Sequence, residues 1–370
     1  MPVPLDEYPI HQAPLSLRHV PASDRNFYDR CYFNAHDRTG NLFLITGLGI
    51  YPNLGVMDAY ATLRRGDRQH AVRMSDALGN ERLDQRVGPY RIEVIEPLEK
   101  IRLICEAAEH GLAFDLTWDG SFPAVEEPRH VWRQNGRITL DACRFAQVGT
   151  WSGVIEVEGE KIAVTPDRWL GTRDRSWGIR PVGESEPPGR SAEEPIEGFW
   201  WTYIPMRFDD FAVIIIMQEE PDGTRVMNDV VRVFPEGSGK RPEQLGWPDI
   251  DVHYASGTRI PTGATLQLRT MDRKDLTMEV ESLGYVALNI GAGYGGDPDW
   301  GHGQWRGRNF VEGAVYDLTD PMVTGRGAFS VIDHVGRATL DGQEGWGLFE
   351  HGCFGRHDPS GFTGYASVAP

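Results

Sequence analysis

Short β-rich runs follow one another from Tyr28 onward, and this pattern limits the fold more than any other feature of the chain. Apolar and polar residues alternate in many runs, and Gly, Pro, Asn or Asp stands at most breaks, as expected for half-buried strands. The stretch YRIEVIEPLEKIRLICEA predicts a hairpin with one buried face, formed by Ile92, Val94, Ile101, Leu103 and Cys105. No segment keeps a helical period with caps at both ends; residues 75–85 are the best short helix candidate.

A polar, Pro- and Gly-rich stretch, residues 182–198, separates two strand-rich halves and is either an interdomain linker or a long loop. The 370 residues also exceed the roughly 100–200 of a usual single domain. We therefore predict an all-β fold of two tandem antiparallel β-barrels with few short helices, residues 1–190 and 191–370. Barrels are favoured because closure removes exposed strand edges, and about eight strands enclose room for one small ligand.

Charge and apolar content exclude several classes of partner. The net charge of −17 argues against nucleic acid or an anionic membrane surface. The longest apolar run, FAVIIIM, is far shorter than the ~20 residues of a membrane-spanning helix, and no signal peptide is expected. Four scattered cysteines without CxxC spacing indicate reduced thiols in a cytoplasmic protein: Cys31, Cys105, Cys143 and Cys353. The sequence is compatible with a homodimer but does not determine the oligomeric state.

The segment GTRDRSWGIRP, residues 171–181, combines three arginines, an aspartate and a tryptophan. Neither a surface loop nor a core strand suits all of these residues, whereas a barrel mouth is apolar on one side and polar on the other. A carboxyl group buried beside indole has a raised pKa and can donate a proton, so Asp174 is a candidate acid and Trp177 a candidate cavity wall. The alternative is that Asp174 only pairs with neighbouring arginines and the segment only closes the barrel.

The same segment resembles the D-x-x-W-G segment of the lipocalin-like family that includes hydroxyneurosporene synthase (carotenoid 1,2-hydratase) and pericyclase-type (Diels–Alderase) relatives acting on apolar natural products. Asp174, Trp177 and Gly178 match it, and residues 333–352 resemble the C-terminal segment of bacterial members. The resemblance implies two lipocalin-like (calycin) barrels, with this segment late in the first. Many relatives have a histidine where this chain has Arg175, so the role of that histidine does not carry over.

Aromatic residues crowd the stretch FWWTY at residues 199–203. In a strand, Phe199, Trp201 and Tyr203 share one face, whereas Trp200 lies on the other. This arrangement predicts a strand that is buried on one side and lines a cavity or the interdomain seam on the other. An ordinary large core is the alternative.

Two further segments supply candidate site residues. The Gly- and Trp-rich residues 289–310 read as a lid or pocket rim, in which His302 is an acid, a base or a solvated loop histidine. Near the C-terminus, Glu350 or His351 at a strand end is expected to face a pocket. The histidines there lack metal-ligand spacing, and no dinucleotide, P-loop, G-x-S-x-G or H-E-x-x-H motif is present, so we expect no metal and no cofactor.

These features predict a cofactor-independent lyase or isomerase of hydratase or cyclase type. Its substrate would be an apolar terpenoid, steroid, polyene or aromatic-alkyl molecule, changed by acid-assisted hydration, dehydration, isomerisation or cyclisation in a water-poor cavity. The catalytic candidates are Asp174, Glu350 and His351. The substrate-binding candidates are Trp177, Arg175, Arg180, Trp201, Tyr203, Trp300, His302 and Trp305. The alternatives are a non-catalytic carrier of a hydrophobic molecule and an interaction protein that uses the acidic surface.

Overall fold

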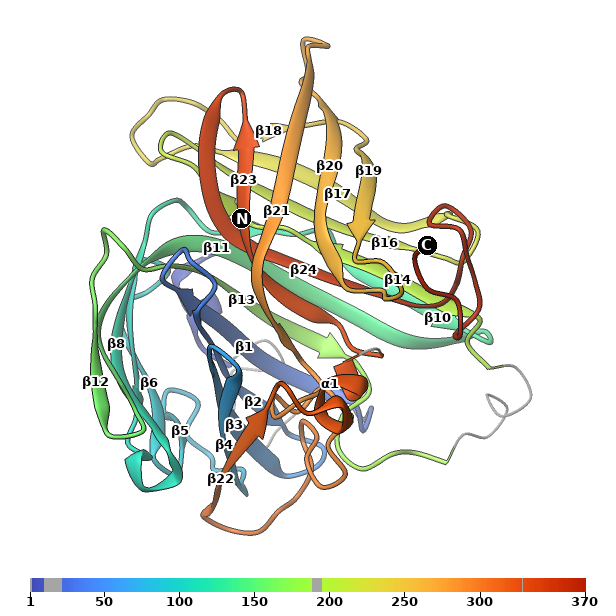
Figure 1. Ribbon diagram of the computed structural model, residues 1–370. Helices are drawn as coiled ribbons and strands as arrows, with labels where there is room; N and C mark the ends of the chain where they lie inside the picture. The colour runs from blue at the N-terminus through green and yellow to red at the C-terminus, as the bar shows by residue number, and fades with distance from the viewer. Residues whose placement is uncertain (1, 10–21, 188–194, 328) are drawn as a thin grey trace.

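The computed structural model describes residues 2–9, 22–187, 195–327 and 329–370, and the predicted all-β class is confirmed. Two antiparallel sheets curl into half-barrels, one at the lower left and one at the top of Figure 1. Helical structure in these ranges is short: η1 (Pro4–Glu7), η2 (Ala108–His110) and α1 (Pro321–Gly327). None of the helices in the described ranges has the length and apolar content needed to cross a membrane.

The first sheet has the strand order β22-β4-β3-β2-β1-β13-β11-β8-β7-β6-β5, with β9, β10 and β12 also paired to the long strand β11. Its strands are β1 (Phe27–His36), β2 (Leu42–Tyr51), β3 (Val56–Arg65), β4 (Arg68–Ala77), β5 (Gln85–Val87), β6 (Tyr90–Glu96), β7 (Lys100–Cys105), β8 (Leu112–Gly120), β9 (Val125–Glu126), β10 (His130–Gln134), β11 (Arg137–Val157), β12 (Glu160–Val164), β13 (Leu170–Ile179) and β22 (Phe310–Asp317).

The second sheet has the order β18-β17-β16-β14-β24-β23-β21-β20-β19, with β15 and β25 attached to its central strands. Its strands are β14 (Gly198–Tyr203), β15 (Met206–Arg207), β16 (Ala212–Glu219), β17 (Arg225–Val233), β18 (Glu243–Gln244), β19 (Asp249–Tyr254), β20 (Pro261–Arg269), β21 (Asp275–Ala287), β23 (Ile332–Leu340), β24 (Gln343–His357) and β25 (Phe362–Thr363).

Of the local structures predicted from the sequence, the hairpin is present and the short helix is not. The hairpin is confirmed as β6 and β7, where Ile92 pairs with Leu103. The short helix predicted at residues 75–85 is wrong, because Ser75 lies in β4, which is hydrogen-bonded to β3 on one side and β22 on the other. Strand pairing here overrides a weak helical signal. The boundary predicted at residues 190/191 lies outside the described residues and stays a prediction. Strand β22 joins the first sheet although it comes from the second half of the chain.

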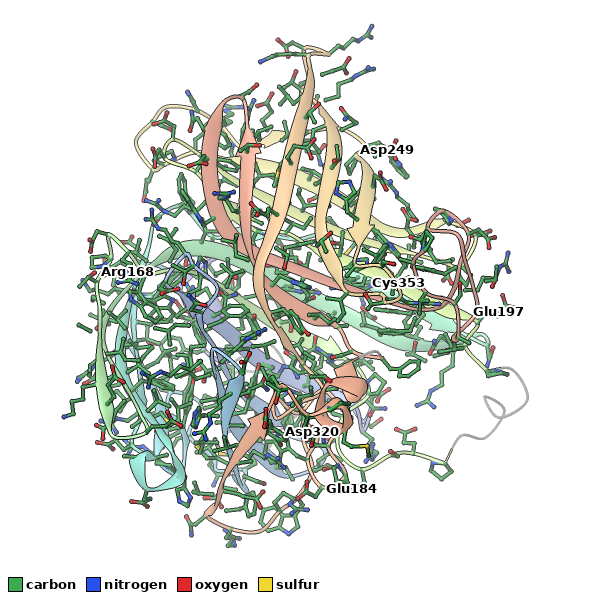
Figure 2. The ribbon with its side chains drawn as sticks, viewed as in Figure 1. Arg168, Glu184, Glu197, Asp249, Asp320 and Cys353 are labelled. Carbon is green, nitrogen blue, oxygen red and sulfur yellow. The ribbon has the colours of Figure 1, made fainter. Side chains whose placement is uncertain are left out.

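Three buried clusters explain how the sheets pack. One cluster fills the inner face of the first sheet, a second fills the inner face of the second sheet, and a third lies between the two sheets. Figure 2 shows Cys353 among the packed side chains of the second sheet, whereas Arg168 and Asp249 lie at the outside. All four cysteines are free, and only Cys143 is not fully buried. We call the contact region between the sheets the seam.

Alternation along β13 resolves the mixed character of residues 171–181. Arg173 and Arg175 pair with Phe33 and Cys31 of β1 and so face the inner core of the first sheet. Asp174 pairs with Tyr32, which belongs to the cluster in the seam. The strand is therefore in the middle of the molecule and carries polar side chains on both of its faces.

Candidate active site

A cavity of about 220 Å³, here called the inner cavity, lies in the seam. The first sheet contributes side chains from β1, β10, β11 and β13, and the second sheet from β14, β16 and β24. Phe199, Trp201, Leu288 and Val331 form an apolar part of the wall. The charged residues of the wall are Arg30, Arg144, Asp174, Arg180 and Glu350.

The carboxyl group of Asp174 lines this cavity and is buried enough for its ionised form to be disfavoured. Burial raises the pKa of Asp174 to about 6, while the guanidinium groups of Arg144 and Arg30 oppose the rise and the Glu350 carboxyl adds to it. An arginine beside Asp174 would by itself lower the pKa of this carboxyl group and oppose an acid role. Burial outweighs that effect here, so Asp174 keeps its proton up to a pH of about 6.

A pair of carboxyl groups, Glu350 and Asp333, lies in the second sheet, and Glu350 lines the inner cavity. Glu350 of β24 pairs across the ladder with Asp333 of β23, and the indole Nε1 of Trp201 donates a hydrogen bond to the Glu350 carboxyl. Asp333 is completely buried and accepts a hydrogen bond of 2.5 Å from the Tyr32 hydroxyl. Burial and the adjacent Glu350 hold the pKa of Asp333 well above its usual range. The protonated form of Asp333 is therefore favoured over the ionised one.

Arg144 joins the two sheets electrostatically. Its Nε lies 3.2 Å from Oε2 of the buried Glu127, and its guanidinium lies 5.5 Å from the ring centre of Trp201 and 5.6 Å from that of Tyr203. Burial raises the pKa of Glu127 to about 7, against the effect of Arg144. Arg144 was not predicted from the sequence. The available signal was its parity, because it is the charged position among Leu140, Ala142, Ala146 and Val148 on one face of β11.

The predicted aromatic strand is placed as expected. Trp201 and Tyr203 belong to the cluster in the seam, whereas Trp200 belongs to the inner core of the second sheet. The His130 ring stacks on Trp201 at 5.6 Å, and burial lowers the pKa of His130 to about 4, so this histidine is neutral.

Other predicted residues lie away from the inner cavity. Arg175 is buried on the opposite face of β13, where its Nη2 lies 2.8 Å from Asp29, and Trp177 shares that face by strand parity. His351 follows Glu350 on β24 and so points into the second core, where its Nε2 is 2.8 Å from the Tyr254 hydroxyl. Burial lowers the pKa of His351 to about 3.

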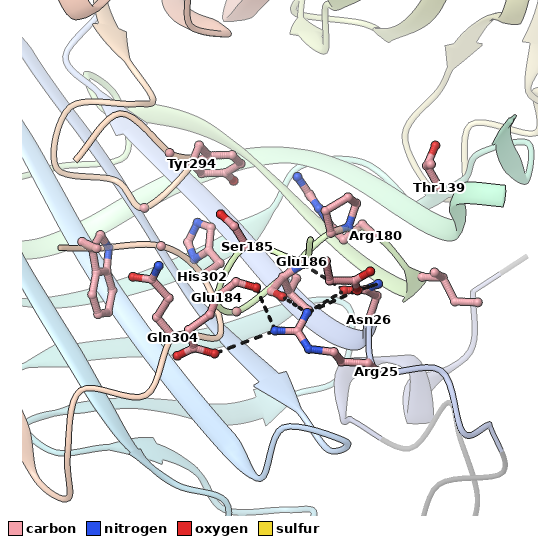
Figure 3. Close-up of a pocket in the computed structure, with 18 of the residues that line it drawn as sticks. Arg25, Asn26, Thr139, Arg180, Glu184, Ser185, Glu186, Tyr294, His302 and Gln304 are labelled. Carbon is pink, nitrogen blue, oxygen red and sulfur yellow. Dashed lines mark hydrogen bonds and ion pairs between the residues drawn. The ribbon is translucent and has the colours of Figure 1, made fainter. Parts of the chain in front are cut away.

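A second, more open cavity of about 600 Å³, the outer cavity, adjoins the inner one (Figure 3). The two share Arg30, Arg180 and Tyr294 in their walls. At the rim, Arg25 is held by the Glu184 carbonyl at 2.8 Å and by Glu186 at 3.4 Å. The shared residues form what we call the junction of the two cavities.

The Gly- and Trp-rich loop forms part of the outer wall. Trp300 and His302 line this cavity and are buried, whereas Trp305 is 47% exposed. His302 packs against the rings of Tyr60 and Tyr294 at 5.1 and 4.7 Å, and burial lowers its pKa to about 4. The solvated-loop interpretation of His302 is therefore wrong. In the described ranges, no group of three His, Cys, Asp or Glu side chains is arranged to hold a metal ion.

Comparisons with known proteins confirm the fold. The chain belongs to a family of unknown function, DUF8625, whose model matches residues 3–363. No curated protein sequence matches the chain significantly.

Several solved structures share the architecture. An AttH candidate from Nitrosomonas europaea has a TM-score of 0.54 at 14% identity, over 88% of this chain and 92% of that one. CghA has a TM-score of 0.51 at 11% identity, over 90% and 89%, and a further structure of CghA contains Sch210972. Kievitone hydratase from Nectria haematococca has a TM-score of 0.49 at 15% identity, over 87% and 88%. At such low identity the likenesses to the AttH candidate and to CghA establish the fold alone. The resemblance to carotenoid hydratases stays a prediction.

Proposed function

We propose that this protein is a cofactor-independent enzyme that binds a small molecule with an apolar body in the inner cavity and transforms it by acid-assisted chemistry. The observation that carries the proposal is the Asp174 carboxyl, which lines that cavity and keeps a proton up to a pH of about 6. A group that titrates close to neutral pH can both give and regain a proton during turnover. The CghA structure with Sch210972 supports ligand binding by this fold.

Asp174 of the first sheet and Glu350 of the second sheet both line the inner cavity and could act as a paired acid and base. In a dehydration, Asp174 would give its proton to the substrate hydroxyl as the C–O bond breaks, and Glu350 would take a proton from the neighbouring carbon. The electron pair of the broken C–H bond then forms the double bond, and water leaves. The Trp201 indole N–H holds the Glu350 carboxyl in place for this step. Hydration is the same sequence reversed, and isomerisation needs only the two proton transfers.

The charged residues of the inner cavity favour some of these reaction types over others. Arg30, Arg144 and Arg180 line it, and guanidinium groups stay protonated at all physiological pH values. A free carbocation would be repelled by these charges, whereas negative charge developing on oxygen would be stabilised. We therefore favour dehydration, hydration or isomerisation next to an oxygen function over a cationic cyclisation. Trp177, which the sequence predicted as a cavity wall, lies on the other face of β13.

A carrier of hydrophobic molecules is the main alternative, since it would have the same fold. A carrier would not need a protonatable carboxyl group in its cavity wall. Burying Asp174 there costs free energy that a purely apolar wall avoids. This arrangement favours the enzyme.

The test compares the native protein with Asp174→Asn, which keeps the side-chain shape and removes the proton. Mass spectrometry of the small molecules that co-purify with the variant should reveal a compound that the native protein converts and the variant does not. The product should have the same mass or differ by one water. Asp141→Asn is the matched control, since Asp141 lies on the neighbouring strand and binds Arg129 at the surface. Equal turnover by native protein and Asp174→Asn would refute the acid role, and binding without conversion by both would favour the carrier.

A further inference from the structure

Arg30 and Arg180 meet at the junction of the two cavities without a carboxylate partner. Arg30 is only 5% exposed; its Nη2 donates a hydrogen bond of 2.8 Å to the Tyr294 hydroxyl, and its guanidinium lies 4.7 Å from that ring centre. The Arg180 guanidinium lies 5.6 Å from the ring of Tyr28 and 5.8 Å from that of Tyr294. Across the part of the chain that the structure describes, neither arginine has a carboxylate oxygen within 4.0 Å.

The two guanidinium groups act on each other unfavourably. Burial, followed by the charge of Arg30, lowers the pKa of Arg180. Arg144 is not free to compensate, since it is positive itself and is bound to Glu127. Asp174 feels the charge of both arginines, but its carboxylate is not within 4.0 Å of either guanidinium group. A buried and a half-buried like charge without a closely paired carboxylate are costly, and a ligand anion at the junction would supply the missing charge.

The position of the pair indicates how a ligand would lie. Both arginines line both cavities, whereas the apolar residues Trp201, Leu288 and Val331 line the inner cavity only. A molecule with its apolar end against these residues would therefore present its other end to the arginines. The guanidinium fork suits a planar group with two oxygens, and the Tyr294 hydroxyl adds a polar contact at the same point.

We propose that Arg30 and Arg180 bind an anionic oxygen group of the substrate, a carboxylate or an enolate, so that the substrate is an amphipathic acid rather than a wholly apolar molecule. That the bound anion is the substrate depends on the function proposed above. That the junction binds an anion does not depend on it. The overall charge of −17 repels anions, so any preference for one must arise from local groups. At the rim, Glu184 and Glu186 are occupied by Arg25.

The test uses two probes that share a naphthalene ring and differ only in charge, naphthoate and naphthamide. Dissociation constants are measured by calorimetry on the full-length protein at physiological ionic strength. We expect the native protein to bind naphthoate about tenfold more tightly than naphthamide, the size of effect typical of one charge-assisted hydrogen bond. Arg30→Met and Arg180→Met should each reduce this ratio toward one while leaving naphthamide affinity nearly unchanged. Arg137→Met is the matched control, because Arg137 lines only the outer cavity, is exposed, and pairs with Glu186.

The outcomes separate the two proposals. The anion site is wrong if the native protein binds naphthoate no more tightly than naphthamide. It is also wrong if the ratio of the two dissociation constants is unchanged in both Arg30→Met and Arg180→Met. In either case, binding of naphthamide would still support an apolar cavity. If Arg137→Met reduces the ratio as much as Arg180→Met, the preference comes from net charge and the proposal also fails. If neither probe binds the native protein, the cavity does not accept such ligands, and both the proposed function and the anion site are overturned. Because Arg180 is only half-buried, its variant should fold even if Arg30→Met does not.

Discussion

The Tyr32 hydroxyl of the first sheet donates a hydrogen bond of 2.5 Å to the Asp333 carboxyl of the second, although 301 positions separate the two residues in the chain. Asn34 Nδ2 in turn donates to the same hydroxyl at 3.2 Å. This contact crosses the seam directly behind Glu350, so it ties the two sheets together at the cavity wall. It also links the stability of the seam to the protonation of the site.

Tyr32→Phe should lower the free energy of unfolding by about 1–3 kcal/mol, because it leaves the buried Asp333 without this donor. Urea denaturation followed by circular dichroism measures the change. Tyr365→Phe is the control: Tyr365 is exposed and donates 3.0 Å to a backbone carbonyl, and its loss should cost less than about 0.5 kcal/mol. Equal effects of the two substitutions would show that the seam contact adds nothing specific.

Asp174 should titrate near pH 6 rather than near its usual value of 3.8. Glu350→Gln should lower the pKa of Asp174, since it removes a neighbouring negative charge, and Arg144→Met should raise it by removing the largest opposing charge. Carboxyl ¹³C NMR of labelled aspartates, assigned with Asp174→Asn, measures the midpoints. If Asp174 is the acid, kcat/KM falls as pH rises through about 6, because the proton it must donate is lost. A midpoint near 4 in the native protein would contradict this description of the site.

Glu127 should make the folded state less stable as pH rises. Its pKa is raised from 4.5 in the unfolded chain to about 7 in the folded protein, so its contribution is fully present below pH 4.5 and is lost as pH rises through 7. Compared with Glu127→Gln, the native protein should therefore lose a few kcal/mol between these limits, because each tenfold difference in proton affinity corresponds to about 1.4 kcal/mol. Denaturation series at matched pH values measure the difference in the free energy of unfolding between the two proteins. The contribution of the histidines is the same in both and cancels in this difference. Parallel curves would show that Glu127 ionises normally.

His351→Ala should destabilise the protein without affecting turnover. The variant removes the hydrogen bond of 2.8 Å to Tyr254 and leaves a cavity in the second core, which costs about 2–4 kcal/mol. Once a substrate is known, its kcat/KM should change less than about twofold, in contrast to Asp174→Asn. Loss of activity in a folded His351→Ala protein would show that His351 takes part in the reaction. It would contradict the placement of His351 on the face of β24 that points away from the inner cavity.

Gly171→Ala should cost about 3 kcal/mol or more, because the added Cβ would lie 2.0 Å from the Asn34 carbonyl oxygen and 2.5 Å from Trp151 Nε1. That carbonyl accepts the Trp151 indole hydrogen bond at 2.8 Å, so backbone and side chain would both have to move. Gly79→Ala is the matched control, since nothing lies within 4 Å of its Cβ. Thermal denaturation compares the two. Equal melting temperatures would show that β13 can shift away from β1 at little cost.

Alternation in the sequence predicted the fold class and which residues share a strand face, although it did not prevent the wrong helix at residues 75–85. It predicted the all-β class, the β6–β7 hairpin and the separation of Trp200 from Trp201 and Tyr203. The physical reason is local: successive side chains of a strand point to opposite sides, whatever the strand packs against. The same rule, applied to β24, would have separated Glu350 from His351, which were proposed together.

Only the tertiary structure decided which faces meet. Arg30 and Arg144 lie beside Asp174 because β1 and β11 flank β13, and Asp333 lies beside Glu350 because β23 pairs with β24. No spacing along the chain records these contacts, or which of these groups meet across the seam. Nor could composition reveal that burial would outweigh the arginines around Asp174, because desolvation depends on how completely the second sheet covers the first. Side-chain direction is a property of each strand, but enclosure is a property of two sheets packed together.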